Sequence, residues 1–80
     1  MQAMNEYIII YNAPNFQSRQ AAVDEFFNRG NFKFRHLSEA WPHIVHVDSD
    51  KTTDQLASAL RADAANSGAI LFSINQTVHV

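Results

Sequence analysis

The chain opens with a run of apolar residues that fills both alternating positions of an extended segment, Glu6-Tyr7-Ile8-Ile9-Ile10-Tyr11-Asn12. Because successive side chains of a strand point to opposite faces, Tyr7, Ile9 and Tyr11 share one face and the two even-numbered isoleucines share the other. The pattern therefore predicts a strand that is covered on both faces. A chain of this length can cover one face with its own helices, so we expect a partner or a stacked ligand on the second.

Two segments have apolar residues at helical spacing. The first runs from Phe16 to Arg29, with Asn15 as its N-cap and Gly30 as a left-handed residue at its C-terminus. The second begins at Thr52-Thr53-Asp54-Gln55, which has the spacing of a capping box, and ends at a glycine-assisted cap, Asn66-Ser67-Gly68. The apolar stripes of both segments predict that these helices pack on a common core.

Four further segments are typical of strands. Phe32-Lys33-Phe34-Arg35-His36-Leu37 alternates with period two, and a short connection joins it to His43-Ile44-Val45-His46-Val47 in an antiparallel hairpin. Ala69-Ile70-Leu71-Phe72-Ser73-Ile74 is apolar on both faces, and Thr77-Val78-His79-Val80 is long enough for a short terminal strand. Trp41, in the hairpin connection, is expected to close one end of the core or else to mark an interface.

The order of elements is therefore β-α-β-β-α-β with an optional last strand. Two right-handed crossovers around an antiparallel core predict an α+β, ferredoxin-like sandwich: a four-stranded antiparallel sheet with both helices on one face and an optional fifth strand. We assign residues 1–80 to a single domain. A core of this size gives roughly 5 kcal/mol or less, which dimerisation would increase.

We accordingly predict a homodimer that forms through the open face of the sheet. The predicted interface residues are Tyr7, Ile9, Tyr11 and Phe72. A shift by one residue would exchange the two faces of the sheet, and the sequence does not say which face the helices cover.

The composition of the chain argues against several classes of binding partner and site. Six basic and eight acidic residues argue against strong nonspecific nucleic-acid binding, although Arg19, Lys33 and Arg35 are candidates for a local basic patch. The lack of cysteine excludes disulfides and thiolate zinc sites.

No apolar run approaches the roughly 20 residues that span a bilayer, and the N-terminus lacks the basic patch of a secretory signal, so we expect a cytoplasmic protein without membrane contact. Met4 is an alternative start to Met1.

Taken together, several of these features resemble one family: the small ferredoxin-like proteins that comprise the CRISPR-associated protein two family, the VapD toxins and their bacterial relatives. The resemblance spans about the whole chain and implies a homodimer that packs sheet against sheet. The features that carry it are the strand Tyr7-Ile8-Ile9-Ile10-Tyr11-Asn12, Trp41 leading into His43-Ile44-Val45-His46-Val47-Asp48, the Thr-capped helix with Leu56 and Leu60, and the closing strand Ile70 to Ile74.

In the nuclease-like members of this family, an Asp ends the first strand and holds a divalent metal together with its copy across the dimer. The corresponding residue here is Asn12, whose neutral amide is a poor ligand for Mg²⁺, and Asp48 is the acid that could replace it. We therefore predict a binding or interaction protein of unknown protein partner, with no catalytic residue, metal or cofactor and without nuclease activity.

Two alternatives remain open. One is a metal-dependent endoribonuclease that uses Mg²⁺. The other is a module for single-stranded RNA, in which aromatic rings on the open face stack on bases. The rings available to it are Tyr7, Tyr11, Phe32 and Phe34.

Four histidines also raise the question of a metal site. His43 and His46 are three residues apart on a predicted strand, so they point to opposite faces and cannot bind one ion together. His36 and His46 are expected to be cross-strand neighbours if the hairpin register allows it. On the open face, their protonation would make dimerisation depend on pH. A surface or structural role for each histidine is the simpler interpretation.

Overall fold

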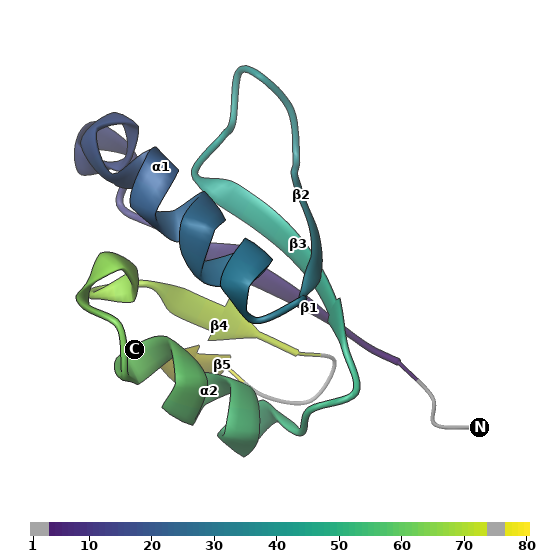
Figure 1. The fold of residues 1–80 in the computed structure, drawn as a ribbon. Coiled ribbons are helices and arrows are strands. Elements are labelled where there is room, and N and C mark those ends of the chain that lie inside the picture. The colour runs from purple at the N-terminus through teal and green to yellow at the C-terminus, as the bar shows by residue number, and fades with distance from the viewer. Residues whose placement is uncertain (1–3, 74–76) are drawn as a thin grey trace.

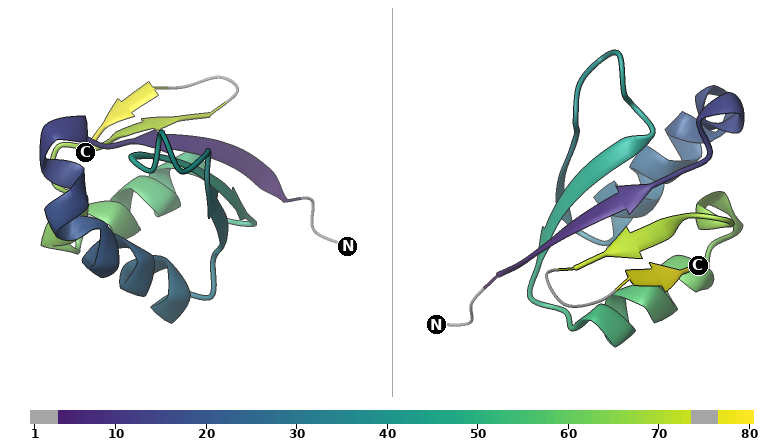
Figure 2. Two further views of the ribbon diagram at one scale, coloured as in Figure 1. Left: turned by 90° about the horizontal axis from the view of Figure 1, so that it is seen from above. Right: turned by 180° about the vertical axis from the view of Figure 1, so that it is seen from behind.

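The computed structural model describes residues 4–73 and 77–80. Both helices lie on the same side of a single antiparallel sheet with the strand order β2-β3-β1-β4-β5 (Figures 1 and 2). The elements are β1 (Asn5–Ile10), α1 (Ala13–Arg29), β2 (Lys33–His36), β3 (Ile44–Ser49), α2 (Thr53–Arg61), the 3-10 turn η1 (Ala64–Asn66), β4 (Ile70–Phe72) and β5 (Thr77–His79).

The mixed α+β class, the two helices and the antiparallel sheet agree with the sequence-based prediction. The sheet has five strands because the optional terminal segment pairs with β4. β4 is shorter than the predicted strand, whose last residue, Ile74, lies outside the described residues. None of the helices in the described part of the chain combines the length and the apolar character needed to cross a membrane.

The side chains of β1 alternate between a covered and an uncovered side of the sheet. Tyr7 and Ile9 are 2% and 0% exposed beneath the helices, whereas Ile8 and Ile10 are only partly buried. β3 repeats the alternation. The core consists of Tyr7, Ile9, Tyr11, Phe16, Val23, Phe26, Phe27, Val45, Val47, Leu56, Ala57, Leu60, Ala69 and Leu71.

Helix α1 begins three residues before the predicted start at Phe16. Its N-cap is Asn12 rather than Asn15, and Pro14 lies in the first turn of the helix. The first backbone N–H groups of a helix have no partner within it, so a proline there loses no hydrogen bond.

The C-terminus of α1 differs from the prediction in which residue is left-handed. Gly30 has φ −81°, and the left-handed residue is Asn31, with φ 56°. Gly30 matters for a different reason: a Cβ on it would lie 2.5 Å from the ring of Phe32 and would force that ring to move. The chain therefore turns tightly at this point, and the Phe32 ring packs against the last turn of the helix.

Helix α2 begins at the predicted capping box. The Thr52 hydroxyl accepts a hydrogen bond from the Gln55 backbone N–H (3.2 Å), and the Gln55 side chain accepts one from the Thr52 N–H (2.9 Å). The helix ends at Arg61, earlier than predicted. The Asp63 side chain then accepts a hydrogen bond from the backbone N–H of Ala65 (2.9 Å) and starts η1 instead.

The one tryptophan of the chain lies in the connection between β2 and β3. Trp41 is 54% exposed, and its ring centroid is 5.8 Å from that of His43. The expectation that it closes one end of the core is wrong, because the connection extends beyond the sheet (Figure 1). Its alternative role at an interface stays a prediction.

Candidate functional site

The side of the sheet opposite both helices, here called the uncovered face, has an apolar centre. Ile10 is paired with Ile44 of β3 and with Ile70 of β4, which makes one cross-strand row. Ile8 and Phe72 form part of the adjacent row. All five side chains are partly exposed, and Figure 2 shows the strands lying in front of both helices when the molecule is seen from behind. An exposed apolar surface of this kind on a small domain is typical of an interaction site.

One end of the uncovered face is charged. Asp48 of β3 lies opposite Glu6 of β1 and opposite Lys33 of β2. In the next row, His46 lies opposite Arg35 on one side and Ile8 on the other. Paired residues of an antiparallel sheet project from the same face, so acidic, basic and imidazole groups meet beside the apolar centre.

Three of these groups converge and are called here the carboxylate–histidine cluster: Glu6, His46 and Asp48. The His46 Nε2 atom is 3.7 Å from Glu6 Oε1 and 3.9 Å from Asp48 Oδ1. The side chains of His46 and Asp48 are 19% and 21% exposed, whereas that of Glu6 is 78% exposed. One ligand atom from each residue lies within 4.8 Å of the others, so the three side chains could hold a metal ion.

Three of the four predicted interface residues lie on the wrong side of the sheet for an interface on the open face. Tyr7, Ile9 and Tyr11 are at most 2% exposed and contact the helices. Only Phe72 lies on the uncovered face, in register with Ile8. The odd-numbered residues Tyr7 and Ile9 of β1 face the helices, so the isoleucines of this strand on the uncovered face are Ile8 and Ile10.

The three basic residues proposed for nucleic-acid contact do not form one patch. Lys33 and Arg35 project from β2 on the uncovered face and are exposed. Arg19 belongs to α1 on the other side, where its guanidinium donates hydrogen bonds to the backbone carbonyls of Ala65 (3.2 Å) and Ser67 (2.7 Å). It therefore links α1 to η1.

Asn12 and Asp48 lie at opposite ends of the sheet. Asn12 is exposed at the N-cap of α1, just beyond the last residue of β1, and its side chain makes no capping hydrogen bond. Asp48 is paired with Glu6, near the first residue of β1. Asn12 follows Glu6, the partner of Asp48, by six residues of extended chain, or about 20 Å, so Asp48 does not take the place of an acid at the position of Asn12.

The aromatic rings expected to stack on bases lie on the covered side of the sheet. Tyr7 and Tyr11 are buried, and Phe32 and Phe34 pack against the core. The ring of Phe34 stacks on that of Phe27 of α1, with centroids 5.1 Å apart. These rings are not available to a ligand on the uncovered face.

The two hydroxyl groups of the core tyrosines reach polar partners at the margins of the core. Tyr7 donates a hydrogen bond to the Lys51 carbonyl (2.6 Å). Tyr11 donates to the Asn66 side-chain oxygen (2.6 Å), and Asn66 in turn donates to the Leu60 carbonyl (3.3 Å). Burial raises the pKa of the Tyr11 phenol above its ordinary value of about 10. Sequence reasoning placed Asn66 in a helix cap and missed its burial in the core, where it is 0% exposed.

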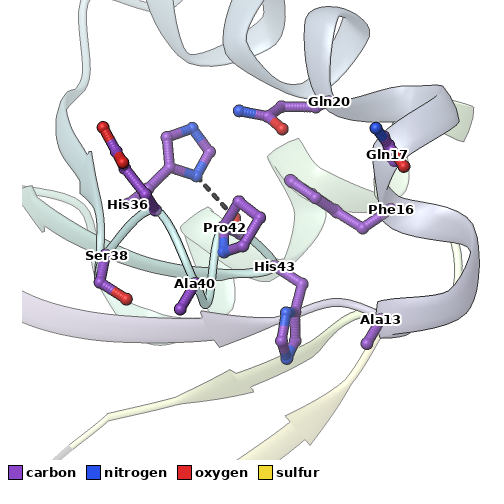
Figure 3. Close-up of a pocket in the computed structure, with 10 residues that line it drawn as sticks. Ala13, Phe16, Gln17, Gln20, His36, Ser38, Ala40, Pro42 and His43 are labelled. Carbon is purple, nitrogen blue, oxygen red and sulfur yellow. Dashed lines mark hydrogen bonds between the residues drawn. The ribbon is translucent and has the colours of Figure 1, made fainter.

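A groove of about 850 Å³ lies between α1 and the connection from β2 to β3 (Figure 3). His36 lies at this groove, and its Nδ1 atom is 2.6 Å from the Pro42 carbonyl oxygen. Its Nε2 atom is 2.7 Å from Asp24 Oδ1. Both neighbours are acceptors, and only a ring protonated on both nitrogens donates to both at once. Because both ring nitrogens are engaged, His36 ties α1 to the connection.

The predicted pairing of His36 with His46 does not form. His36 is in register with Val45 on the covered side, and His46 is in register with Arg35 on the uncovered side. The two imidazoles therefore lie on opposite faces of the sheet, and only His46 belongs to the candidate site.

Comparisons of the chain with protein-family models, with curated proteins and with solved structures found no match. Function is therefore inferred from the sequence and the geometry of this chain.

Proposed function

We propose that this chain is a ferredoxin-like domain that self-associates into a homodimer through the uncovered face and acts as a binding or interaction protein, in the manner of the CRISPR-associated protein two and VapD proteins that it resembles. The strand order β2-β3-β1-β4, with α1 and α2 as crossovers, supports the ferredoxin-like assignment, and β5 then extends the sheet beyond β4.

The observation that carries the proposal is the apolar centre of the uncovered face. Its five side chains occupy two adjacent rows on three neighbouring strands. Neither helix covers them, since both helices pack on the other side (Figure 2). Burying such a patch stabilises an assembly by roughly 25 cal/mol per Å² of apolar surface removed from water.

A second copy of the chain suits this face because the face carries charges of both signs. Glu6 and Asp48 lie beside Lys33 and Arg35 at one end. A two-fold axis brings the same patch of both copies together, so an acidic group of one copy can lie near a basic group of the other. The apolar rows then pack on each other at the centre.

The size of the face predicts a weak dimer. Five strands spaced about 4.8 Å apart give a sheet about 24 Å wide, and the strands have only three to six residues each. The buried area per copy is thus below the roughly 800 Å² of a standard interface. Exposed Leu37 and Trp41, beside the sheet, offer additional apolar area. We expect a dissociation constant on the order of micromolar or weaker.

Sedimentation equilibrium from micromolar to millimolar concentration tests the proposal. Wild type should pass from one chain to two, and Ile10→Glu should remain a single chain, because Ile10 lies between Ile44 and Ile70 in the apolar centre. Ala22→Glu, on the exposed surface of α1, is the matched control and should dimerise like wild type. A wild-type protein that stays monomeric at millimolar concentration would contradict the proposed function.

A nuclease assay with Mg²⁺ separates this function from the endoribonuclease alternative. Cleavage of RNA by the wild-type chain would overturn the assignment as a binding protein. The RNA-binding alternative is not carried further, because the four rings on which it depended pack on the covered side of the sheet.

A further inference from the structure

We propose that Glu6, His46 and Asp48 form a binding site for a divalent transition-metal ion, with Zn²⁺ as the preferred occupant. The site lies at the charged end of the uncovered face and is built by β1 and β3 alone. It needs only one copy of the chain, so it does not depend on the proposed homodimer.

The register of two strands brings the three ligands together. Glu6 and Asp48 are directly opposite each other, and His46 is two residues from Asp48 on the same strand and face. Each side chain therefore leaves the same surface within one cross-strand spacing of the others. Backbone hydrogen bonding of the sheet fixes these positions. A bound ion would therefore have to order only the three side chains and not the backbone.

The separations within the cluster suit a shared ion better than direct hydrogen bonds. The distances of 3.7 and 3.9 Å from His46 Nε2 to the two carboxylate oxygens exceed the usual 2.7–3.2 Å of a hydrogen bond from nitrogen to oxygen. Ligand atoms that surround a tetrahedral Zn²⁺ at about 2.0–2.2 Å lie about 3.4 Å apart. The three ligand atoms lie within 4.8 Å of one another. Side-chain movements of up to about 1.4 Å would therefore close the site.

The electrostatics of the sheet also favour a cation at this position. Glu6 and Asp48 are like charges directly opposite each other, an arrangement that destabilises a sheet. A divalent ion between them removes this repulsion. Two cations of β2 compete with the ion: Lys33 lies opposite Asp48, and Arg35 lies opposite His46.

The chemistry of the donors selects the class of metal. One imidazole nitrogen with two carboxylate oxygens matches ions of intermediate softness, whereas Mg²⁺ and Ca²⁺ prefer oxygen alone. The chain has no cysteine, which removes the thiolates that soft ions prefer. Three protein ligands leave a fourth position for solvent, and Glu6 lies on the solvent side of the cluster.

Isothermal titration calorimetry with Zn²⁺ on the whole chain measures the site directly. We expect one ion per chain, with affinity reduced by about 10- to 100-fold or more in His46→Ala and in Asp48→Asn. His79→Ala removes an exposed histidine of β5 and is the matched control, which should bind like wild type. Circular dichroism checks that each variant keeps its fold.

Paramagnetic Mn²⁺ gives a second readout that locates the ion. At low Mn²⁺ concentration, the NMR signals of the His46 ring should broaden before those of the His79 ring. Zn²⁺ affinity that is unchanged in both His46→Ala and Asp48→Asn, or equal broadening of the two rings, would overturn the site. A monomeric protein that still binds Zn²⁺ through these residues would refute the proposed dimer and retain the metal site.

Discussion

The two faces of the sheet both carry isoleucines of β1, but these side chains lie in different environments. In β1, Ile9 is fully buried against the helices, whereas its neighbours Ile8 and Ile10 are partly exposed on the other side. The covered face carries its polar atoms at its margins, where Tyr7 and Tyr11 hydroxyls find acceptors. The uncovered face brings charged side chains directly beside isoleucines. Equal hydropathy along a strand thus does not imply equal burial.

The largest expected effect compares neighbouring isoleucines of one strand. Ile9→Ala should lower the free energy of unfolding by about 3 to 4 kcal/mol, because it leaves a cavity in a closed core. Ile8→Ala should lower it by about 1 kcal/mol, since Ile8 is partly exposed in the monomer. Urea unfolding at low protein concentration measures both. Equal losses for the two variants under monomeric conditions would contradict the distinction between the faces.

The next effect concerns the buried Tyr11 at high pH. Burial raises the pKa of its phenol in the folded state, so between about pH 10 and that higher pKa the unfolded chain loses a proton that the folded chain retains. The stability contributed by neutral Tyr11 is therefore complete below about pH 10 and declines above it by about 1.4 kcal/mol per pH unit. Urea unfolding at several alkaline pH values measures this slope.

Tyr11→Phe is the comparison for the alkaline slope. The variant should be less stable at neutral pH by about 1 to 2 kcal/mol, because the buried Asn66 oxygen loses its donor. It should also lose the Tyr11 part of the decline above pH 10. An alkaline slope identical to that of wild type would show that the Tyr11 phenol does not resist ionisation in the folded chain.

The smallest expected effects come from two neighbouring residues of β2. His36→Leu should cost about 1 to 2 kcal/mol, because it removes the contacts with Asp24 and the Pro42 carbonyl. Arg35→Ser, on the uncovered face, should change the free energy of unfolding by less than about 0.5 kcal/mol. Thermal unfolding of the two variants, measured beside wild type, checks both predicted losses. A larger loss for Arg35→Ser would place that side chain in a structural contact.

Local sequence patterns predicted the elements well because each has a local physical cause. The capping box at Thr52 and Gln55 forms as predicted, since both hydrogen bonds span only three residues. The alternation of β2 is also correct, with Lys33 and Arg35 exposed and Phe34 facing the core. Helix ends were less accurate, because Pro14 is compatible with both a turn and the first helical turn.

The candidate site could not be predicted because it depends on contacts between distant residues. An all-apolar strand gives no signal for which face the helices cover, and three of the predicted interface residues, Tyr7, Ile9 and Tyr11, lie on the covered side. The carboxylate–histidine cluster depends on the register of Glu6 with Asp48, 42 positions later in the chain. Neither residue belongs to a motif, so their proximity follows only from the fold.

The two edge strands of the sheet, β2 and β5, limit how copies of this chain can associate. β2 has four residues, among them Lys33 and Arg35, and β5 has three. Short or charged edge strands are poor templates for strand addition, because an incoming chain gains few backbone hydrogen bonds there and meets charged side chains. Open-ended growth into fibrils through the sheet edges is therefore disfavoured, whereas face-to-face contact, as in the proposed homodimer, would close the assembly at two copies.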